Sequence, residues 1–131
     1  MKVLLVCDGE YRLYTEATAN AIRTFRPDVE VALTDMGELE AEVERLDPQL
    51  VIAAGTAIPK NPIPEKVIGY IELSLESDGL SRFRVGERGW ESTNPALGEI
   101  LLAVDEGKRL YRRTSHAQEP IENIDPTEMY A

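Results

Sequence analysis

Three strand-like segments alternate with two segments of helical periodicity in the first part of the chain. Residues 2–6 and 50–54 are short apolar runs with the length of a buried strand, and residues 29–33 alternate Val29, Val31 and Leu33 with Glu30 and Ala32. Residues 12–25 and 35–46 lie between them and repeat apolar side chains at intervals of three and four. Strands and helices that alternate in this way pair in parallel through right-handed crossovers. The pattern therefore predicts an α/β unit in which helices cover a parallel sheet in three layers.

The two predicted helices have defined faces and ends. Pro27 ends the first, and Asp35 with Glu38 has the spacing of a capping box that begins the second. The apolar stripe of the first helix is predicted to comprise Leu13, Tyr14, Ala17, Ala21, Ile22 and Phe25.

The alternation changes after Gly55. Residues 55–66 contain three prolines and no run suited to a helix. Residues 67–92 read as an antiparallel meander, with tight turns at Asp78-Gly79 and at residues 86–89. Asn94, followed by Pro95, is predicted to cap a last helix.

The domain organisation follows from these elements. Residues 1–113 form one α/β domain, in which the antiparallel extension and the last helix replace later βα units. Residues 114–131 are a polar, proline-interrupted tail. Such a tail becomes ordered only when it packs against something, and the open edge of the meander could receive it, within one chain or between two copies. A homodimer is therefore expected.

Charge and cysteine content restrict the partners and the compartment. The 131 residues carry 24 acidic against 14 basic side chains, a formal net charge of −10. This field repels phosphate backbones and anionic lipids, so neither a nucleic acid nor a membrane is an expected partner. One cysteine cannot form an intramolecular disulfide, and no apolar run approaches the roughly 20 residues of a membrane helix. A cytoplasmic protein is expected.

The end of the first strand carries the side chains with the most obvious chemistry. Cys7, Asp8 and Glu10 follow the apolar run, and the two carboxylates could hold Mg²⁺ only weakly without an octahedral frame. An acid–base pair is the alternative for these carboxylates. The phosphate loop of low-molecular-weight tyrosine phosphatases needs an arginine six positions after its cysteine, and Arg12 comes one position early. A structural role for Cys7 is favoured, and no other cofactor is expected.

The first half of the chain resembles a response-regulator receiver domain, a flavodoxin-like family of two-component signalling. The resemblance lies in KVLLVCDGE and in the later segment VEVALTDMGELEAEVERLDPQLVIAAG. The resemblance implies a site made of an acidic pair, a phosphorylated Asp after the third strand, a Thr or Ser, and a Lys before a proline. These positions fall on Cys7 with Asp8, on Ala54, on Ser74 and on Asn94. Since Ala54 has no nucleophile, the resemblance implies a degenerate receiver that cannot be phosphorylated at the usual position.

The expected function is accordingly a non-catalytic receiver-like signalling or protein-interaction module, with Tyr70 and Trp90 as contact residues for an unidentified protein. The rival class is a small enzyme or ligand-binding domain. It would use the crevice at the ends of strands one and three, near Asp8, Glu10 and Gly55.

Overall fold

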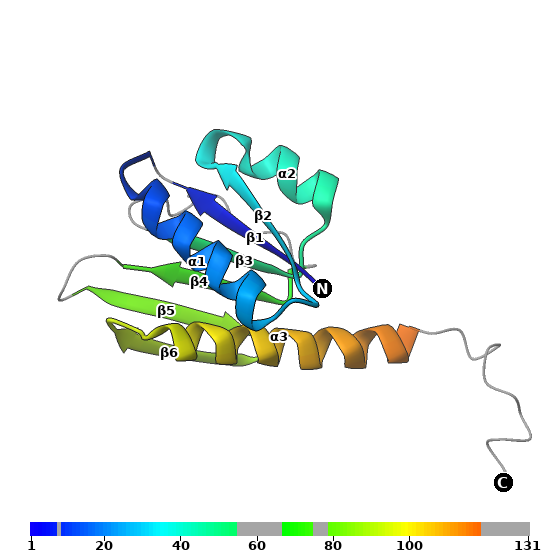
Figure 1. Ribbon diagram of the computed structural model, residues 1–131. Coiled ribbons are helices and arrows are strands. Elements are labelled where there is room, and N and C mark those ends of the chain that lie inside the picture. The colour runs from blue at the N-terminus through cyan, green and yellow to red at the C-terminus, as the bar shows by residue number, and fades with distance from the viewer. Residues whose placement is uncertain (8, 55–66, 75–78, 119–131) are drawn as a thin grey trace, which may run out of the picture.

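Six strands, three α-helices and two 3-10 turns make up the part of the chain that the computed structural model describes, residues 1–7, 9–54, 67–74 and 79–118 (Figure 1). In chain order the elements are β1 (Lys2–Cys7), η1 (Gly9–Tyr11), α1 (Arg12–Phe25), β2 (Glu30–Asp35), η2 (Met36–Glu38), α2 (Leu39–Leu46), β3 (Leu50–Ala54), β4 (Gly69–Leu73), β5 (Leu80–Val85), β6 (Arg88–Thr93) and α3 (Leu97–Gln118).

All six strands join one mixed sheet in the order β2-β1-β3-β4-β5-β6. The first four pair in parallel, whereas β5 and β6 are antiparallel to their neighbours. The predicted α/β architecture, with parallel strands first, an antiparallel extension later and a C-terminal helix, is confirmed. The predicted turn at Asp78 and the proline-rich stretch 55–66 lie outside the described residues.

The hairpin from β5 to β6 closes through a two-residue turn. Gly86 is the first of the two central residues and has a φ of 62°, a backbone conformation that would be strained for a residue with a side chain. Glycine at this position is typical of the type II′ turn, whose twist matches the flanking strands. The turn places Val85 opposite Arg88, and the whole register of the hairpin follows from that pair.

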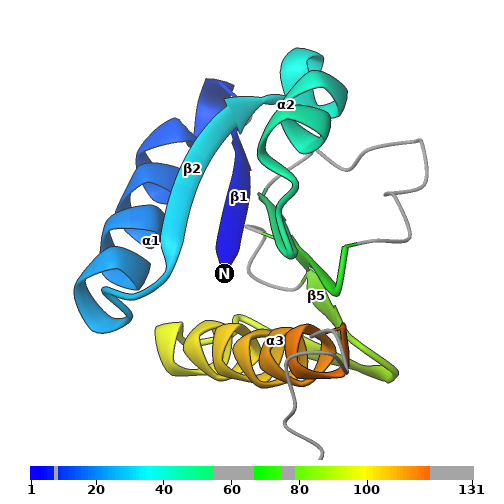
Figure 2. The same cartoon turned by 90° about the vertical axis from the view of Figure 1, so that its right-hand side faces the viewer.

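The sheet buries side chains on both faces, and different helices cover each one (Figure 2). The cluster beneath α1 and α3 includes Ile22, Phe83 and Val104, while the cluster beneath α2 includes Leu4 and Val43. Continuous apolar runs in β1 and β3 result from burial on both faces, as expected for central parallel strands. Strands β5 and β6 instead alternate buried or partly buried residues with exposed ones, because α2 does not extend over them.

The buried face of α1 differs from the predicted stripe. Its buried residues are Thr15, Thr18, Ala19 and Ile22, whereas Leu13 is 83 % exposed and Phe25 55 %. The threonines tolerate burial because each hydroxyl donates a hydrogen bond to a carbonyl one turn earlier, Thr15 to Tyr11 at 3.0 Å and Thr18 to Tyr14 at 2.9 Å. An apolar strip therefore lies on the solvent side of α1.

Helices α2 and α3 both begin later than predicted, α2 at Leu39 and α3 at Leu97. Asp35 ends β2 and its side chain makes no capping hydrogen bond, since η2 intervenes before α2. Asn94 has a φ of 49°, a left-handed conformation that asparagine adopts more readily than most residues, and it turns the chain between β6 and α3. Helix α3 continues to Gln118, so the first residues assigned to the tail are helical, and residues 119–131 lie outside the described part.

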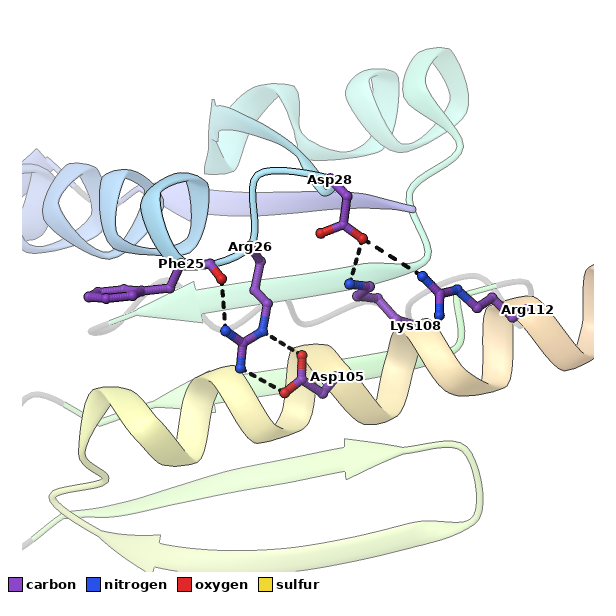
Figure 3. Close-up of polar contacts among 6 residues, drawn as sticks. All are labelled: Phe25, Arg26, Asp28, Asp105, Lys108 and Arg112. Atoms are coloured by element: carbon purple, nitrogen blue, oxygen red, sulfur yellow. Dashed lines mark hydrogen bonds and ion pairs between the residues drawn. The ribbon is translucent and has the colours of Figure 1, made fainter.

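Ion pairs fasten the end of α1 to α3 (Figure 3). The guanidinium of Arg26 donates two hydrogen bonds to the carboxylate of Asp105, at 2.6 and 2.8 Å. Asp28 in the following turn faces Lys108 and Arg112 of α3. These contacts hold α3 against α1, and α3 is then positioned over β5 and β6 (Figure 1). Among the described helices, none combines the length and apolar character that crossing a bilayer requires.

Candidate functional site

The parallel strands bring three of the predicted site positions to one edge of the sheet. Ala53 pairs with Val6, and Ala54 pairs with Leu73, so Cys7, Ala54 and Ser74 all lie at or just beyond the carboxyl ends of neighbouring strands. Ligand sites of doubly wound α/β proteins form at this edge. The structure therefore brings these three residues together at one edge of the sheet.

Cys7 is a poor nucleophile in this position. Its side chain is 6 % exposed, and burial raises the pKa of the thiol. The nearby positive charge of Arg12 opposes that rise, but its guanidinium is mostly exposed and donates a 3.1 Å hydrogen bond to Glu16. Arg12 therefore does not complete a phosphate-binding loop around the thiol, in agreement with the structural role predicted for Cys7.

Ala54 and Ser74 bring little further reactivity to the edge. Ala54 is 2 % exposed and offers only a methyl group at the end of β3. The backbone N–H of Ser74 donates a 2.9 Å hydrogen bond to the Ser81 hydroxyl, which joins the ends of β4 and β5. Ser74 is partly exposed, and its position is compatible with the structural task of ending β4.

Asn94 lies farther from the other three. It follows β6, whose direction is that of β4 because β5 between them is antiparallel to both. It therefore reaches the same edge, but two strand spacings from β4, on the order of 10 Å. The structure thus separates Asn94 from Cys7, Ala54 and Ser74, with which the resemblance grouped it.

The carboxylates of the predicted metal site fall in a part of the chain about which little is described. Asp8 and Gly55 lie outside the described residues, and of Glu10 only the backbone position in η1 is described. Among the described side chains, no group of three or more His, Cys, Asp or Glu residues could hold a metal ion.

The antiparallel extension places its two predicted contact residues on opposite faces. Tyr70 packs against the cluster beneath α2, whereas Trp90 packs against the cluster beneath α1 and α3. Their side chains therefore lie on opposite faces of the sheet, although both residues line the hollow between β4 and β6.

On the face of Tyr70, the strands β4 to β6 surround a hollow of about 460 Å³. Among the described residues the buried Tyr70 hydroxyl has no hydrogen-bond partner, and burial raises its pKa strongly. Arg84 lies opposite Tyr70, and Gly89 follows Arg84 across the sheet. In the neighbouring row Arg82 lies between Glu72 and Glu91. This face is polar and carries both signs of charge.

Trp90 occupies a different environment on the other face. Its ring stacks on Phe83 with 5.0 Å between centroids and 5° between planes. Its Nε1 donates a 3.1 Å hydrogen bond to Glu99, whose other carboxylate oxygen accepts a 2.8 Å bond from the Ser92 hydroxyl. The Arg88 guanidinium lies 6.0 Å from the Trp90 ring centroid.

A second hollow, of about 530 Å³, runs between β6 and α3 beside Trp90. It is lined by Arg88, Trp90, Glu99, Leu102, Asp105, Glu106 and Arg109. Reasoning from sequence missed Arg88 and Glu99, which become neighbours only when α3 folds back over the hairpin. The two-residue turn at Gly86 was the available signal for Arg88, because it fixes the register of β6.

Comparisons with protein-family models, with curated proteins and with solved structures give no match.

Proposed function

We propose that this domain is a receiver-like signalling module that acts by binding proteins and is not phosphorylated at the position usual for receivers. The three-layer, flavodoxin-like arrangement belongs to this proposal. It is supported by the order β2-β1-β3-β4 with parallel pairing, which matches the first four strands of the doubly wound order 2-1-3-4-5. The covering of opposite sheet faces by α1 and α2 is in keeping with it.

The observation that carries the proposal is the residue at the carboxyl end of β3. Phosphoryl transfer to a receiver needs a carboxylate oxygen as nucleophile and cations that neutralise the phosphoryl oxygens. Ala54 supplies no oxygen, the thiol of Cys7 is buried with a raised pKa, and Asn94 lies two strand spacings from β4. Binding is the remaining role for which the domain offers surface, namely the extension made by β4, β5 and β6.

Treatment with acetyl phosphate and Mg²⁺, followed by intact-mass measurement, tests the chemical half of the proposal. The unmodified chain should gain no phosphoryl mass, while a receiver domain that carries the acceptor Asp, treated in parallel, shows that the reagent is active. The Ala54→Asp variant restores the missing carboxylate and is needed before an adduct can form at this position. A phosphoryl adduct on any residue of the unmodified chain would overturn the proposal.

A further inference from the structure

Strand β6 ends the sheet and leaves a row of backbone groups unpaired. The Gly86 N–H donates a 2.8 Å hydrogen bond to the Ile68 carbonyl across β4 and β5. Because antiparallel ladders alternate, Val85, Phe83 and Ser81 direct their backbone groups toward β6, where they meet Arg88, Trp90 and Ser92. The backbone groups of Gly89, Glu91 and Thr93 consequently point away from the sheet. Within the described ranges they have no partner.

The opposite edge of the sheet, at β2, has one of its backbone acceptors occupied. At β2 the Arg23 guanidinium donates a 3.0 Å hydrogen bond to the Val31 carbonyl and so occupies an acceptor of that edge strand. An exposed row of strand donors and acceptors is a template for another strand. Strand β6 is therefore the edge available for pairing.

We propose that a second copy of this chain pairs with β6 in antiparallel register about a two-fold axis, which joins the two sheets into one. The inference rests on the proposed binding function and narrows it to one partner. A two-fold axis of this kind places one residue opposite itself, and only Trp90 or Glu91 lies near the middle of the strand.

Charge decides between these two registers. With Glu91 at the axis, two like carboxylates would face each other directly, which destabilises strand pairs. With Trp90 at the axis, Glu91 faces Gly89 of the second copy, which has no side chain and is exposed. The outward groups of Gly89 and Glu91 then exchange hydrogen bonds with their counterparts. The register centred on Trp90 is favoured.

The same register makes the remaining contacts complementary. Arg88 comes opposite Ser92 of the second copy, and the Ser92 hydroxyl is bound to the Glu99 carboxylate. The Arg88 guanidinium of each copy thus lies near the Glu99 carboxylate of the other copy, so this contact occurs once on each side of the axis. The two Trp90 rings meet at the axis and extend the stack that each makes with Phe83.

An exposed apolar side chain of α3 lies beside this contact. Leu102 is 67 % exposed and lines the hollow between β6 and α3 together with Trp90. Two copies paired at β6 would bring their α3 helices to the same face of the joined sheet and would cover Leu102. Burial of Leu102 would add apolar area to the pairing of the two strands.

A proline substitution at the edge tests the pairing. Glu91→Pro removes an N–H that makes no bond within the sheet, and proline is tolerated on edge strands. Glu91→Ala is the matched control, because it removes the carboxylate and keeps the N–H. In sedimentation velocity over a concentration series, wild type and Glu91→Ala should be dimers, while self-association of Glu91→Pro should weaken by at least about tenfold. Its circular dichroism spectrum should match that of wild type, and its melting temperature should fall only by the stabilisation that dimerisation contributes. A wild type that stays monomeric, or a Glu91→Pro chain as dimeric as wild type, would overturn the inference.

Cysteine substitutions test the register independently of the proline variant. Trp90→Cys places a thiol at the axis in a pair without backbone hydrogen bonds, where side chains lie closest, so mild oxidation should cross-link two copies. Glu91→Cys should cross-link much more slowly, and buried Cys7 does not compete. The Trp90 register would be refuted if Glu91→Cys cross-linked faster than Trp90→Cys, or if neither variant cross-linked.

The outcome is separable from that of the proposed function. A monomeric chain without a phosphoryl adduct ends this inference alone, whereas an adduct on a dimeric chain ends the proposed function and leaves the pairing.

Discussion

Gly69 marks the point at which the parallel part of the sheet joins the antiparallel part, and a single methyl group there should be costly. It is the first residue of β4 and is paired with Leu50 of β3 on one side and Val85 of β5 on the other. A Cβ atom at Gly69 would lie 2.7 Å from Leu50 Cδ1, 2.9 Å from the Arg84 carbonyl oxygen and 3.3 Å from Val85 Cγ2. Leu50 is fully buried and the Arg84 carbonyl belongs to the β4–β5 ladder, so neither can move aside easily.

Gly69→Ala should therefore destabilise the protein by about 1–3 kcal/mol, the usual cost of overpacking a well-packed core. The free energy of unfolding from urea titrations measures the loss. Gly98→Ala is the matched control, because Gly98 lies in α3 with nothing within 4 Å of the added Cβ. The same substitution should stabilise there by about 0.5–1 kcal/mol, since alanine favours helix. If Gly69→Ala is as stable as wild type, the close approach of β3, β4 and β5 is wrong.

Two further predictions concern titratable groups. The hydrogen bonds from Arg26 hold the pKa of Asp105 below its usual value, so this carboxylate adds stability above its unfolded pKa of about 3.9 and loses it as pH falls through the lower folded value. The free energy of unfolding of Asp105→Asn should therefore fall less steeply than that of wild type below about pH 4. The difference should be less than about 1 kcal/mol because the ion pair is partly exposed. Equal slopes for the two proteins in urea titrations from about pH 5 to about pH 2.5 would contradict the pairing. Because burial raises the pKa of Cys7, iodoacetamide at neutral pH should alkylate the native protein far more slowly than the urea-unfolded chain, and equal rates would show that the thiol is accessible.

The parallel half of the fold could be predicted because its strands are buried on both faces. Continuous apolar runs such as LVIAA leave few alternatives, and their alternation with helices determines the parallel pairing. The same logic places Cys7 and Ala54 at one edge, since parallel strands end together, whereas Ser74 joins them because β4 also pairs in parallel with β3. These positions depend on chain order alone and need no side-chain contact to be known.

The face of α1 could not be read from hydrophobicity. Thr15 and Thr18 count as polar in a sequence, yet their hydroxyls bond back to the helix and leave methyl groups for the core. Leu13 and Phe25 count as apolar but lie on the outer side. An apolar pattern on both sides of a helix leaves its orientation open, and packing against β1 and β2 decides it.

The site at Trp90 needed contacts between distant segments. The opposite faces of Tyr70 and Trp90 follow from the registers of two hairpins. The sequence indicates turns at Asp78-Gly79 and at residues 86–89, and the two-residue turn at Gly86 fixes the register of β6. The position of Glu99 beneath Trp90 depends on how α3 lies over β6, which the ion pairs of Arg26 and Asp28 help to fix. The isolated sequence of α3 contains no sign of this placement.

One native mass spectrum of the full chain, recorded after treatment with acetyl phosphate and Mg²⁺, tests the central claim most directly. It reports the assembly and the chemical state of the protomers together. A module that binds through β6 and carries Ala54 at the acceptor position should appear as a dimer of two unmodified chains. A phosphoryl group on the chain would contradict the claim.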